Sequence, residues 1–326
     1  MVTLETKIEI FPLRQRFSIS RGSKTETVVV TVELRDGEYA GRGECGPNIR
    51  YDETPESVAD EIAAMAAGIE GGLDRDGLQQ AMPPGAARNA LDCAFWDLQA
   101  KQTGQPVWAL AGLAKPVPVE TAFTLSVDTP VAMAEAARAN ASRPLLKLKL
   151  TGAGDLDRVR AVRQGAPDAR LIVDANEAWT PADFTALATE LAGIGVEMIE
   201  QPLPAGDDAA LAALAHPVPI CADESCHDRA SVAELVDRYD MINIKLDKAG
   251  GLTEALATAA VARAVGLDIM VGCMVGTSLA MAPAHLVAQA AKIVDLDGPL
   301  LLAEDREPSL EVNGSRIFPP TAALWG

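Results

Sequence analysis

The pattern of apolar and polar residues divides the chain into two parts that predict different orders of strands and helices. In residues 1 to about 50, apolar and polar residues alternate at 7–10 and 17–20, and a β-branched run at 27–34 ends at Asp36-Gly37, a hairpin signal. Two helices are expected next, from Thr54-Pro55 to about residue 68 and from about 85 to 102. This order predicts an α+β domain over residues 1–115.

One stretch of the first part resembles a nucleotide-binding fingerprint. Residues 41–46, Gly-Arg-Gly-Glu-Cys-Gly, match G-x-G-x-x-G literally, but Pro47 follows where the fingerprint requires a helix. We therefore reject a dinucleotide site and expect a turn at these residues.

From residue 117 onward, short apolar strands alternate with helices of about a dozen residues, several of which begin at a threonine–proline pair, as at 129–130 and 180–181. Strands are expected at 118–126, 145–151, 170–175, 196–201, 218–222, 240–246, 268–272 and 292–296. Strict alternation predicts an α/β fold in which a parallel sheet closes into a barrel; a doubly wound open sheet is the alternative.

No clear helix follows the eighth predicted strand. The expected fold is therefore a (β/α)7β TIM-like barrel over residues 116–300, with the N-terminal α+β unit as a capping domain. Residues 301–326 contain prolines and short extended pieces, and we expect them to return to the capping domain.

Composition narrows the class of function. A net charge of −18 over 326 residues argues against nucleic acid and against anionic membranes. Five scattered cysteines without C-x-x-C indicate reduced thiols, and neither a signal peptide nor a membrane span is recognisable. We expect a cytoplasmic protein that acts on a small molecule, and no pattern argues against a homo-oligomer.

Three successive predicted strands each end in a carboxylate: Asp174, Glu200 and Asp223. In a barrel of this kind, the carboxyl ends of the strands form the active site. Converging carboxylates repel one another unless a cation neutralises them, and oxygen ligands favour Mg²⁺ or Mn²⁺. Each acid alone could cap a helix, but three in succession favour a metal site.

Lysines frame these carboxylates. Residues 145–150 read Leu-Leu-Lys-Leu-Lys-Leu, which puts Lys147 and Lys149 on one face of a strand, and Lys245 ends the sixth strand. Alone, the first pair would suit a solvated edge strand. Beside a metal that acidifies the α-proton of a bound carboxylate, Lys149 and Lys245 could remove and return a proton on opposite faces of one carbon, inverting it. Lys147 would keep Lys149 partly neutral by like-charge repulsion.

The motifs Lys-x-Lys, Asp-x-Asn, Glu-Gln-Pro, Ala-Asp-Glu-Ser and Lys-x-x-Lys-x-Gly-Gly follow one another in this order. Together they resemble the muconate-lactonizing subgroup of the enolase superfamily over nearly the whole chain. The resemblance implies Asp174, Glu200 and Asp223 as Mg²⁺ ligands, with Lys149 and Lys245 as the acid/base pair.

Within that superfamily the chain most resembles the dipeptide epimerases. The resemblance implies a Mg²⁺-dependent 1,1-proton transfer at the α-carbon of the C-terminal residue of a dipeptide, with L-Ala-D/L-Glu as the expected substrate and peptidoglycan recycling as the role. Asp295 and Asp297 resemble the Asp-x-Asp that holds the dipeptide's ammonium group. Arg21 resembles the loop arginine that binds the side-chain carboxylate, and Lys24 would assist it.

Further residues are expected at the substrate pocket. Cys273 and Met274 follow the seventh strand in the family's manner, and Tyr51 lies in a second capping-domain loop that would face the pocket. Gly276 departs from the glutamate that several relatives carry there, which leaves the shape of the pocket open.

Two alternatives remain at this stage. Muconate cycloisomerisation, or dehydration to o-succinylbenzoate, would use the same enolate intermediate on a substrate without an ammonium group, for which Asp295 and Asp297 would be unhelpful. A non-catalytic metal- or ligand-binding barrel would leave the two opposed lysines unexplained.

Overall fold

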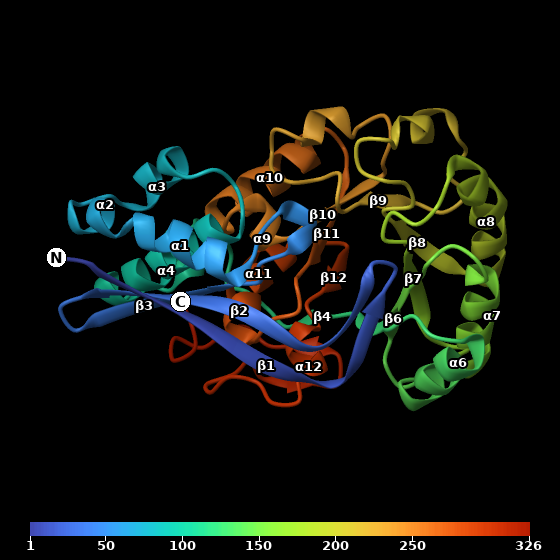
Figure 1. The fold of residues 1–326 in the computed structure, drawn as a ribbon, viewed down its shortest axis with the longest axis horizontal. Helices are drawn as coiled ribbons and strands as arrows, with labels where there is room; N and C mark the ends of the chain where they lie inside the picture. The colour runs from blue at the N-terminus through green and yellow to red at the C-terminus, as the bar shows by residue number, and fades with distance from the viewer.

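The computed structural model describes residues 1–326 and begins with a three-stranded antiparallel sheet (Figure 1). Its strands are β1 (Thr3–Ile19), β2 (Gly22–Asp36) and β3 (Tyr39–Cys45). The alternating stretches at 7–10 and 17–20 were expected as two strands, but residues 7–10 and 17–19 both belong to β1, and Ser20 begins the turn. The pairing of β1 with β2 is irregular between Pro12 and Phe17. Ser20 and Arg21 form the tight turn of this hairpin, and residues 22–24 already belong to β2.

Helices cover one face of this sheet. They are α1 (Pro55–Ala64), α2 (Ala66–Glu70), α3 (Arg75–Ala81), α4 (Ala86–Thr103) and α5 (Val107–Leu110). Val30, Val32 and Leu34 alternate along β2 and pack with α1 and α4 in one apolar cluster. We use "capping domain" for this sheet and these helices.

The turn expected at residues 41–46 is wrong, because residues 41–45 lie within β3. A Cβ atom on Gly41 would overlap the carbonyl oxygen of Ala94, and one on Gly43 would overlap that of Ala90. The two glycines therefore let the backbone of α4 pack directly on the strand.

Eight parallel strands form the second sheet, in the order β12-β11-β10-β9-β8-β7-β6-β5. The backbone N–H of Ala122, before β5, donates to Val294 O of β12 at 2.8 Å and closes the ring. The predicted barrel with its capping domain is confirmed, and the open sheet is excluded. The strands are β5 (Phe123–Leu125), β6 (Leu145–Lys149), β7 (Arg170–Asp174), β8 (Val196–Glu200), β9 (Ile220–Ala222), β10 (Met241–Ile244), β11 (Asp268–Gly272) and β12 (Ile293–Asp295).

Helices do not follow every barrel strand. The connections after β8 and β9, where helices were expected, contain only the 3-10 turns η2 (Ala209–Ala213) and η3 (Val232–Glu234). Prolines at 202, 204, 217 and 219 oppose a long helix in the first of these. The remaining helices are α6 (Pro130–Ala139), α7 (Asp155–Gly165), α8 (Pro181–Ile194), α9 (Leu246–Ala249), α10 (Leu252–Ala264), α11 (Ser278–Ala288) and α12 (Gly298–Leu301).

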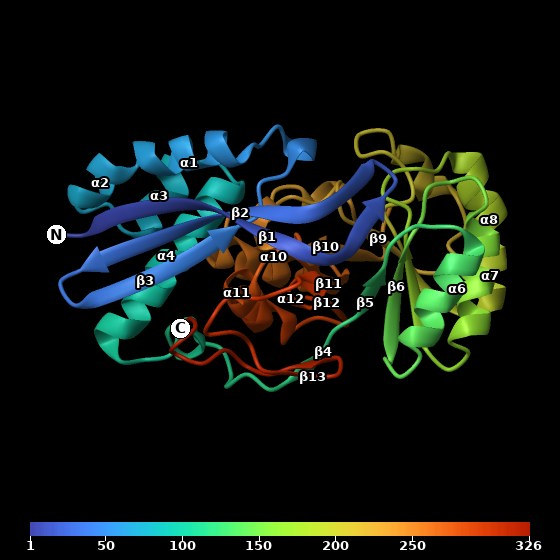
Figure 2. The same cartoon turned by 60° about the horizontal axis from the view of Figure 1, so that its bottom comes forward.

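The C-terminal segment runs beneath the barrel and back to the capping domain (Figure 2). Strands β13 (Val312–Asn313) and β14 (Arg316–Ile317) pair with β4 (Val119–Glu120) in a third small sheet. Trp325 Nε1 then donates to Cys93 O of α4 at 3.0 Å. The domain limits at residues 115 and 300 stay predictions. None of the helices combines the length and the hydropathy that a membrane-spanning helix requires.

Candidate active site

The barrel interior is built in layers by the two-residue period of its strands. An apolar ring takes one residue from each strand or its approach: Ala122, Leu145, Ile172, Met198, Cys221, Met241, Met270 and Ile293. Two residues further along each strand, the next inward layer is almost entirely polar: Thr124, Lys147, Asp174, Glu200, Asp223, Asn243, Gly272 and Asp295. Polar side chains therefore gather above a closed apolar floor.

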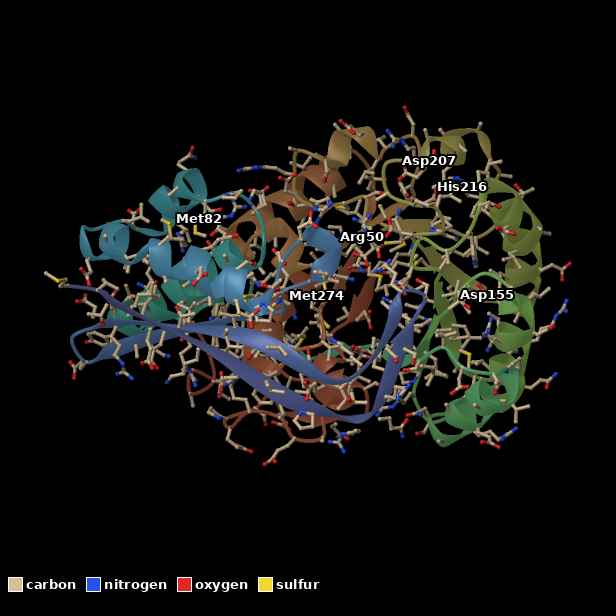
Figure 3. All side chains as sticks on the ribbon, in the orientation of Figure 1. Arg50, Met82, Asp155, Asp207, His216 and Met274 are labelled. Atoms are coloured by element: carbon tan, nitrogen blue, oxygen red, sulfur yellow. The ribbon has the colours of Figure 1, made fainter.

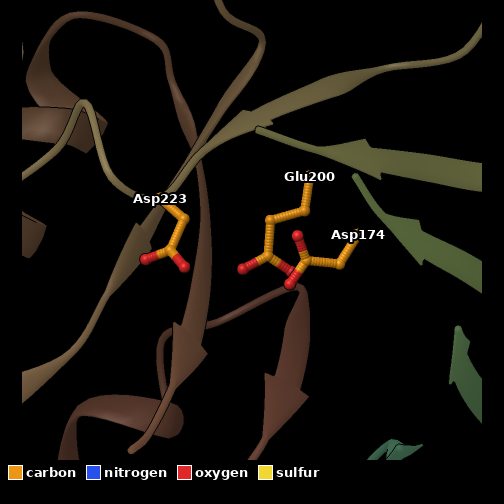
Figure 4. A group of neighbouring side chains, drawn as sticks. All are labelled: Asp174, Glu200 and Asp223. Atoms are coloured by element: carbon orange, nitrogen blue, oxygen red, sulfur yellow. The ribbon is translucent and has the colours of Figure 1, made fainter. Parts of the chain in front are cut away.

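Asp174, Glu200 and Asp223 converge in this layer from β7, β8 and the end of β9 (Figure 4). One oxygen atom of each lies within 4.8 Å of the others, and all three residues are buried. Glu200 Oε2 makes no hydrogen bond of good geometry, but the ammonium group of Lys147 lies 2.6 Å from it. Burial, together with the charge of Asp174, raises the pKa of Glu200 to about 7. Three buried carboxylates whose oxygens converge in this way fit a divalent cation.

Lys149 and Lys245 approach the carboxylate cluster from different strands. Lys149 Nζ donates to Asp174 Oδ2 at 2.6 Å, and Lys245 Nζ donates to Asp223 Oδ2 at 2.6 Å. Both residues line the same cavity, and strands β7, β8 and β9 separate the strands that carry them. Burial opposes the charge of Lys245, but the carboxylates of Asp223 and Glu200 raise its pKa.

Lys147 lies deeper and is surrounded by carboxylates. Its Nζ is 2.6 Å from Glu200 Oε2, 2.7 Å from Asp295 Oδ2 and 3.4 Å from Asp174 Oδ2. Burial opposes its charge, but these carboxylates raise its pKa well above the ordinary value. The effect of Lys147 on Lys149 stays a prediction, and the surrounding negative charge would weaken it.

A cavity of about 560 Å³ opens above the cluster, a volume within the usual range for small-molecule sites. Its walls come from the barrel and from the turns of the capping domain at 19–24 and 46–51, the second of which contains η1 (Ile49–Tyr51). Tyr51 lines it and packs edge-on against His227, with 5.2 Å between ring centroids. Cys273 and Met274 line it from the barrel side, where Asn48 Nδ2 donates to Met274 Sδ at 3.4 Å. Figure 3 places Arg50 and Met274 between the two parts of the molecule.

The two predicted cations of the cavity differ in their surroundings. Arg21 donates to Glu224 at 2.7 Å and to Glu177 at 3.1 Å. Lys24 donates only to Thr27 Oγ1, at 3.3 Å, and takes part in no ion pair. Lys24 as a whole is exposed, but the protein around its ammonium group displaces water from it, which lowers the pKa of Lys24. Lys24 is therefore the cation of this cavity without a carboxylate partner.

Asp295 and Asp297 are buried and do not line the cavity. Asp295 Oδ2 accepts from Lys147, whereas its Oδ1 has no partner. Asp297 Oδ2 accepts from Thr124 N at 2.6 Å, and burial with the charge of Asp295 raises the pKa of Asp297 to about 7. The structure thus leaves one buried acceptor free on Asp295.

Known proteins match the chain over most of its length. A family described as mandelate racemase / muconate lactonizing enzyme, N-terminal domain, matches residues 2–112, and one described as enolase C-terminal domain-like matches residues 130–322. The chain belongs to the enolase superfamily. The resemblance drawn from its motifs is confirmed.

Several relatives within the enolase superfamily are similar over nearly their whole length. The L-Ala-D/L-Glu epimerase of Escherichia coli is 49% identical over 95% of this chain and 98% of its own. An N-acetyl-D-glutamate racemase of a Pseudoalteromonas species is 44% identical over 91% and 95%. An Agrobacterium tumefaciens enolase-family structure, with homology to dipeptide epimerases and with bound sodium and L-Ala-L-Glu, is 52% identical, with a TM-score of 0.98 and full coverage of both chains. The predicted enzyme class, isomerase, is confirmed.

Two residues to which the sequence motifs gave no role hold this enolase-superfamily site together. Asn243 Nδ2 donates to Glu200 Oε1 at 2.7 Å, and Lys248 Nζ donates to Asp223 Oδ1 at 2.7 Å. Burial opposes ionisation, but Lys245 and Lys248 hold the pKa of Asp223 well below its usual range. Asn243 precedes Lys245 by two residues, so the alternation of β10 could have placed its side chain inward.

The sequence motifs gave no role to Glu177 either. It accepts from Arg50 Nε and Nη2, both at 2.8 Å, as well as from Arg21 and from the backbone N–H of Ala205 at 2.8 Å. It therefore fastens both capping-domain turns to the barrel. Gly276, by contrast, does not line the cavity; a Cβ there would lie 3.0 Å from Glu44 Oε1.

Proposed function

We propose that the chain is a metal-dependent epimerase that transfers a proton at the α-carbon of the C-terminal residue of a dipeptide, with L-Ala-D/L-Glu as its substrate. The placement of Lys149 and Lys245, at the ends of different strands but at one cavity above a carboxylate cluster, carries this proposal. Two proton-transfer groups on either side of a carbon can remove a proton from one face and return one to the other.

Asp174, Glu200 and Asp223 would hold the metal, Mg²⁺ or Mn²⁺, because their donors are oxygens. A bound divalent cation would increase the acidity of the α-proton of a substrate carboxylate. Lys149 or Lys245 would take that proton, depending on the diastereomer, and the other lysine would return one. The capping-domain turns, fastened by Glu177, would exclude water from the cavity.

Charge at the two ends of the site supports an acidic dipeptide. Lys24, without a carboxylate partner, would receive the side-chain carboxylate of the C-terminal residue, and Arg21 would stand beside it. The free Oδ1 of Asp295, with Asp297 two residues on, would receive the ammonium group of the N-terminal residue.

The surroundings of Asp295 also favour a second candidate, racemisation of an N-acylated acidic amino acid. Lys147 already pairs with Asp295, and neither Asp295 nor Asp297 lines the cavity. A substrate without an ammonium group would need no contact with either residue, so Asp295 could keep its pairing with Lys147. The proton chemistry and its lysines would be the same.

The test is incubation with L-Ala-D-Glu, L-Ala-L-Glu or N-acetyl-D-glutamate and Mg²⁺ in D₂O, following the Glu α-proton and the isomer ratio by NMR. Exchange with inversion of the dipeptides alone supports dipeptide epimerisation. Replacing Asp295 and Asp297 together with Asn should then reduce dipeptide turnover at least tenfold. Exchange of N-acetyl-D-glutamate alone would replace our choice by the second candidate, and exchange of none would refute both.

We further propose a cytoplasmic enzyme of peptidoglycan recycling. Five free cysteines, four of them buried, support a reducing compartment. The strongly acidic charge supports a small-molecule substrate rather than nucleic acid or an anionic membrane.

A further inference from the structure

Side chains of helix α4 of the capping domain hydrogen-bond the loop that follows Lys245. Lys245 precedes α9, and Gly250 and Gly251 then adopt positive φ angles of 79° and 113°. Arg88 of α4 donates to Ala249 O at 2.8 Å and to Gly250 O at 3.1 Å. One turn further along α4, the carboxylate of Asp92 accepts from the backbone N–H and hydroxyl of Thr253, at 3.0 and 2.6 Å. Residues 245–253 are therefore held on a polar surface of another domain.

Asp247 makes the most direct connection between the loop after Lys245 and the capping domain. Its Oδ1 accepts from Asn89 Nδ2 of α4 at 2.9 Å and from the backbone N–H of Gly46 at 3.0 Å. Both donors belong to the capping domain, and Gly46 lines the substrate cavity. The residue is 8% exposed. A buried carboxylate two residues after Lys245 thus binds the cavity wall and α4 at once.

Lys149 has no such support: Ser20 and Arg21 of the capping domain donate to Asn176 O of the neighbouring loop, at 3.0 and 3.1 Å, but no capping-domain residue hydrogen-bonds the loop behind Lys149. The loop behind it is held by Asp155, whose carboxylate accepts from the backbone N–H groups of Thr151 at 3.0 Å and Gly152 at 2.7 Å. Trp179 Nε1 donates to the same carboxylate at 2.8 Å. These residues all belong to the barrel, and Figure 3 places Asp155 on its α7 side, far from the helices of the capping domain.

We propose that the capping domain positions Lys245 but not Lys149, with Asp247 as the positioning residue that transmits the contact. This inference rests on the proposed two-lysine reaction. It gives the capping domain a part in proton transfer on one face of the substrate, in addition to closing the cavity.

A displaced Lys245 should affect proton transfer at only one face of the substrate's α-carbon. When a lysine takes the α-proton, the C–H bond breaks and its electron pair stays with the substrate. A proton returned by the same lysine gives exchange without inversion, and one returned by the opposite lysine gives the inverted product. Displacing Lys245 should therefore leave exchange by Lys149 intact while inversion falls.

The experiment compares Asp247→Ala with wild type in D₂O, measuring exchange into recovered substrate and inversion for L-Ala-D-Glu and L-Ala-L-Glu separately. Lys149→Ala and Lys245→Ala first identify the diastereomer that each lysine deprotonates. For the Lys149 diastereomer, Asp247→Ala should raise the exchange-to-inversion ratio at least tenfold. For the Lys245 diastereomer, both rates should fall together.

Two control variants separate positioning from a general loss of stability. Asp247→Asn keeps an oxygen acceptor for Asn89 and Gly46, so its ratio should stay near that of wild type. Asp97→Asn alters a buried carboxylate on the same helix that binds Arg42 and Gly326 instead of the loop. If Asp97→Asn only destabilises the protein, partial unfolding lowers the exchange rate and the inversion rate by the same factor. The exchange-to-inversion ratio of Asp97→Asn should therefore equal that of wild type.

Amide hydrogen exchange gives a second measurement that does not need activity. Asp247→Ala should speed exchange at residues 246–251 and leave residues 150–155 unchanged. An unchanged ratio together with unchanged amide protection would overturn the inference while leaving the proposed function in place. A wild-type protein that exchanges neither diastereomer would refute the proposed function, and the inference with it.

Discussion

Lys149 and Lys245 face one carboxylate cluster but are held by different means. Lys149 is the last residue of β6, paired in register with Asp174 of the neighbouring strand. Lys245 lies just beyond β10, as the cap of a four-residue helix whose last carbonyl Arg88 binds. The backbone ladder of the sheet fixes the first lysine, whereas side-chain contacts between two domains fix the second.

This difference separates two kinds of support for the lysines at one site. A strand end inside a closed barrel has little freedom, because every neighbouring strand restrains it. A loop residue depends on whatever packs over the loop. A change in the capping domain should therefore reach Lys245 more readily than Lys149.

Removing each lysine gives the largest expected effect. Lys149→Ala and Lys245→Ala should each lower inversion by about 10²–10⁴-fold, the range for loss of a general acid or base. Each variant should still exchange the α-proton of one diastereomer, and the two should retain opposite diastereomers. The NMR assay in D₂O measures both quantities. Near-normal inversion by both variants would eliminate the two-lysine mechanism.

The charge of Asp247 should make the Lys245 side sensitive to pH. Burial, with Glu53 and Glu44 nearby, raises the pKa of Asp247 from 3.8 to about 7. Because the folded protein binds this proton more tightly than the unfolded chain, the stability from Asp247 is present below about pH 4 and lost as pH rises through about 7. Asp247→Asn carries no such charge.

The free energy of unfolding of Asp247→Asn, relative to wild type, should therefore rise by about 2–3 kcal/mol between pH 5 and pH 8. Urea unfolding of both proteins at the two pH values measures this difference. A difference that does not vary with pH would show that Asp247 is already ionised in the folded protein at pH 5.

The carboxylate cluster and the barrel could be predicted because they follow from short-range patterns. Alternation fixes which residues of each strand face inward, so the carboxylates at 174, 200 and 223 and the lysine at 149 were placed from the sequence. Closure of the barrel then brings these strand ends together. The lysine at 147 was placed on the right face, but its three carboxylate partners come from other strands.

Contacts between the domains could not be predicted in this way. Asn89 and Asp247 are far apart in the sequence, and neither lies in a local pattern that names the other. Arg21 was expected to be available for substrate, yet Glu177 and Glu224 already bind it. The glycines of β3 read as turn residues because their reason, the close approach of α4, is visible only in three dimensions.

The smallest expected effect comes from substituting the glycines in the loops behind the two lysines. Gly251, behind Lys245, and Gly152, behind Lys149, have similar φ angles of 113° and 102°. Alanine at either position meets the same kind of backbone strain, on the order of 1–3 kcal/mol. At Gly251 the new Cβ would also lie 2.5 Å from the Cβ and Oδ2 of Asp92, whereas at Gly152 the nearest atom is Ala178 O at 3.4 Å.

Gly251→Ala should therefore lower the free energy of unfolding by about 1–2 kcal/mol more than Gly152→Ala, since only the first forces α4 and the loop apart. It should also raise the exchange-to-inversion ratio for the Lys149 diastereomer, because the displaced loop carries Lys245. Gly152→Ala should not raise that ratio. Urea unfolding and the NMR assay on the two variants measure both effects. If Gly251→Ala and Gly152→Ala lose the same stability and show the same exchange-to-inversion ratio, the loop behind Lys245 can move without displacing the lysine. Lys149 and Lys245 would then be supported alike.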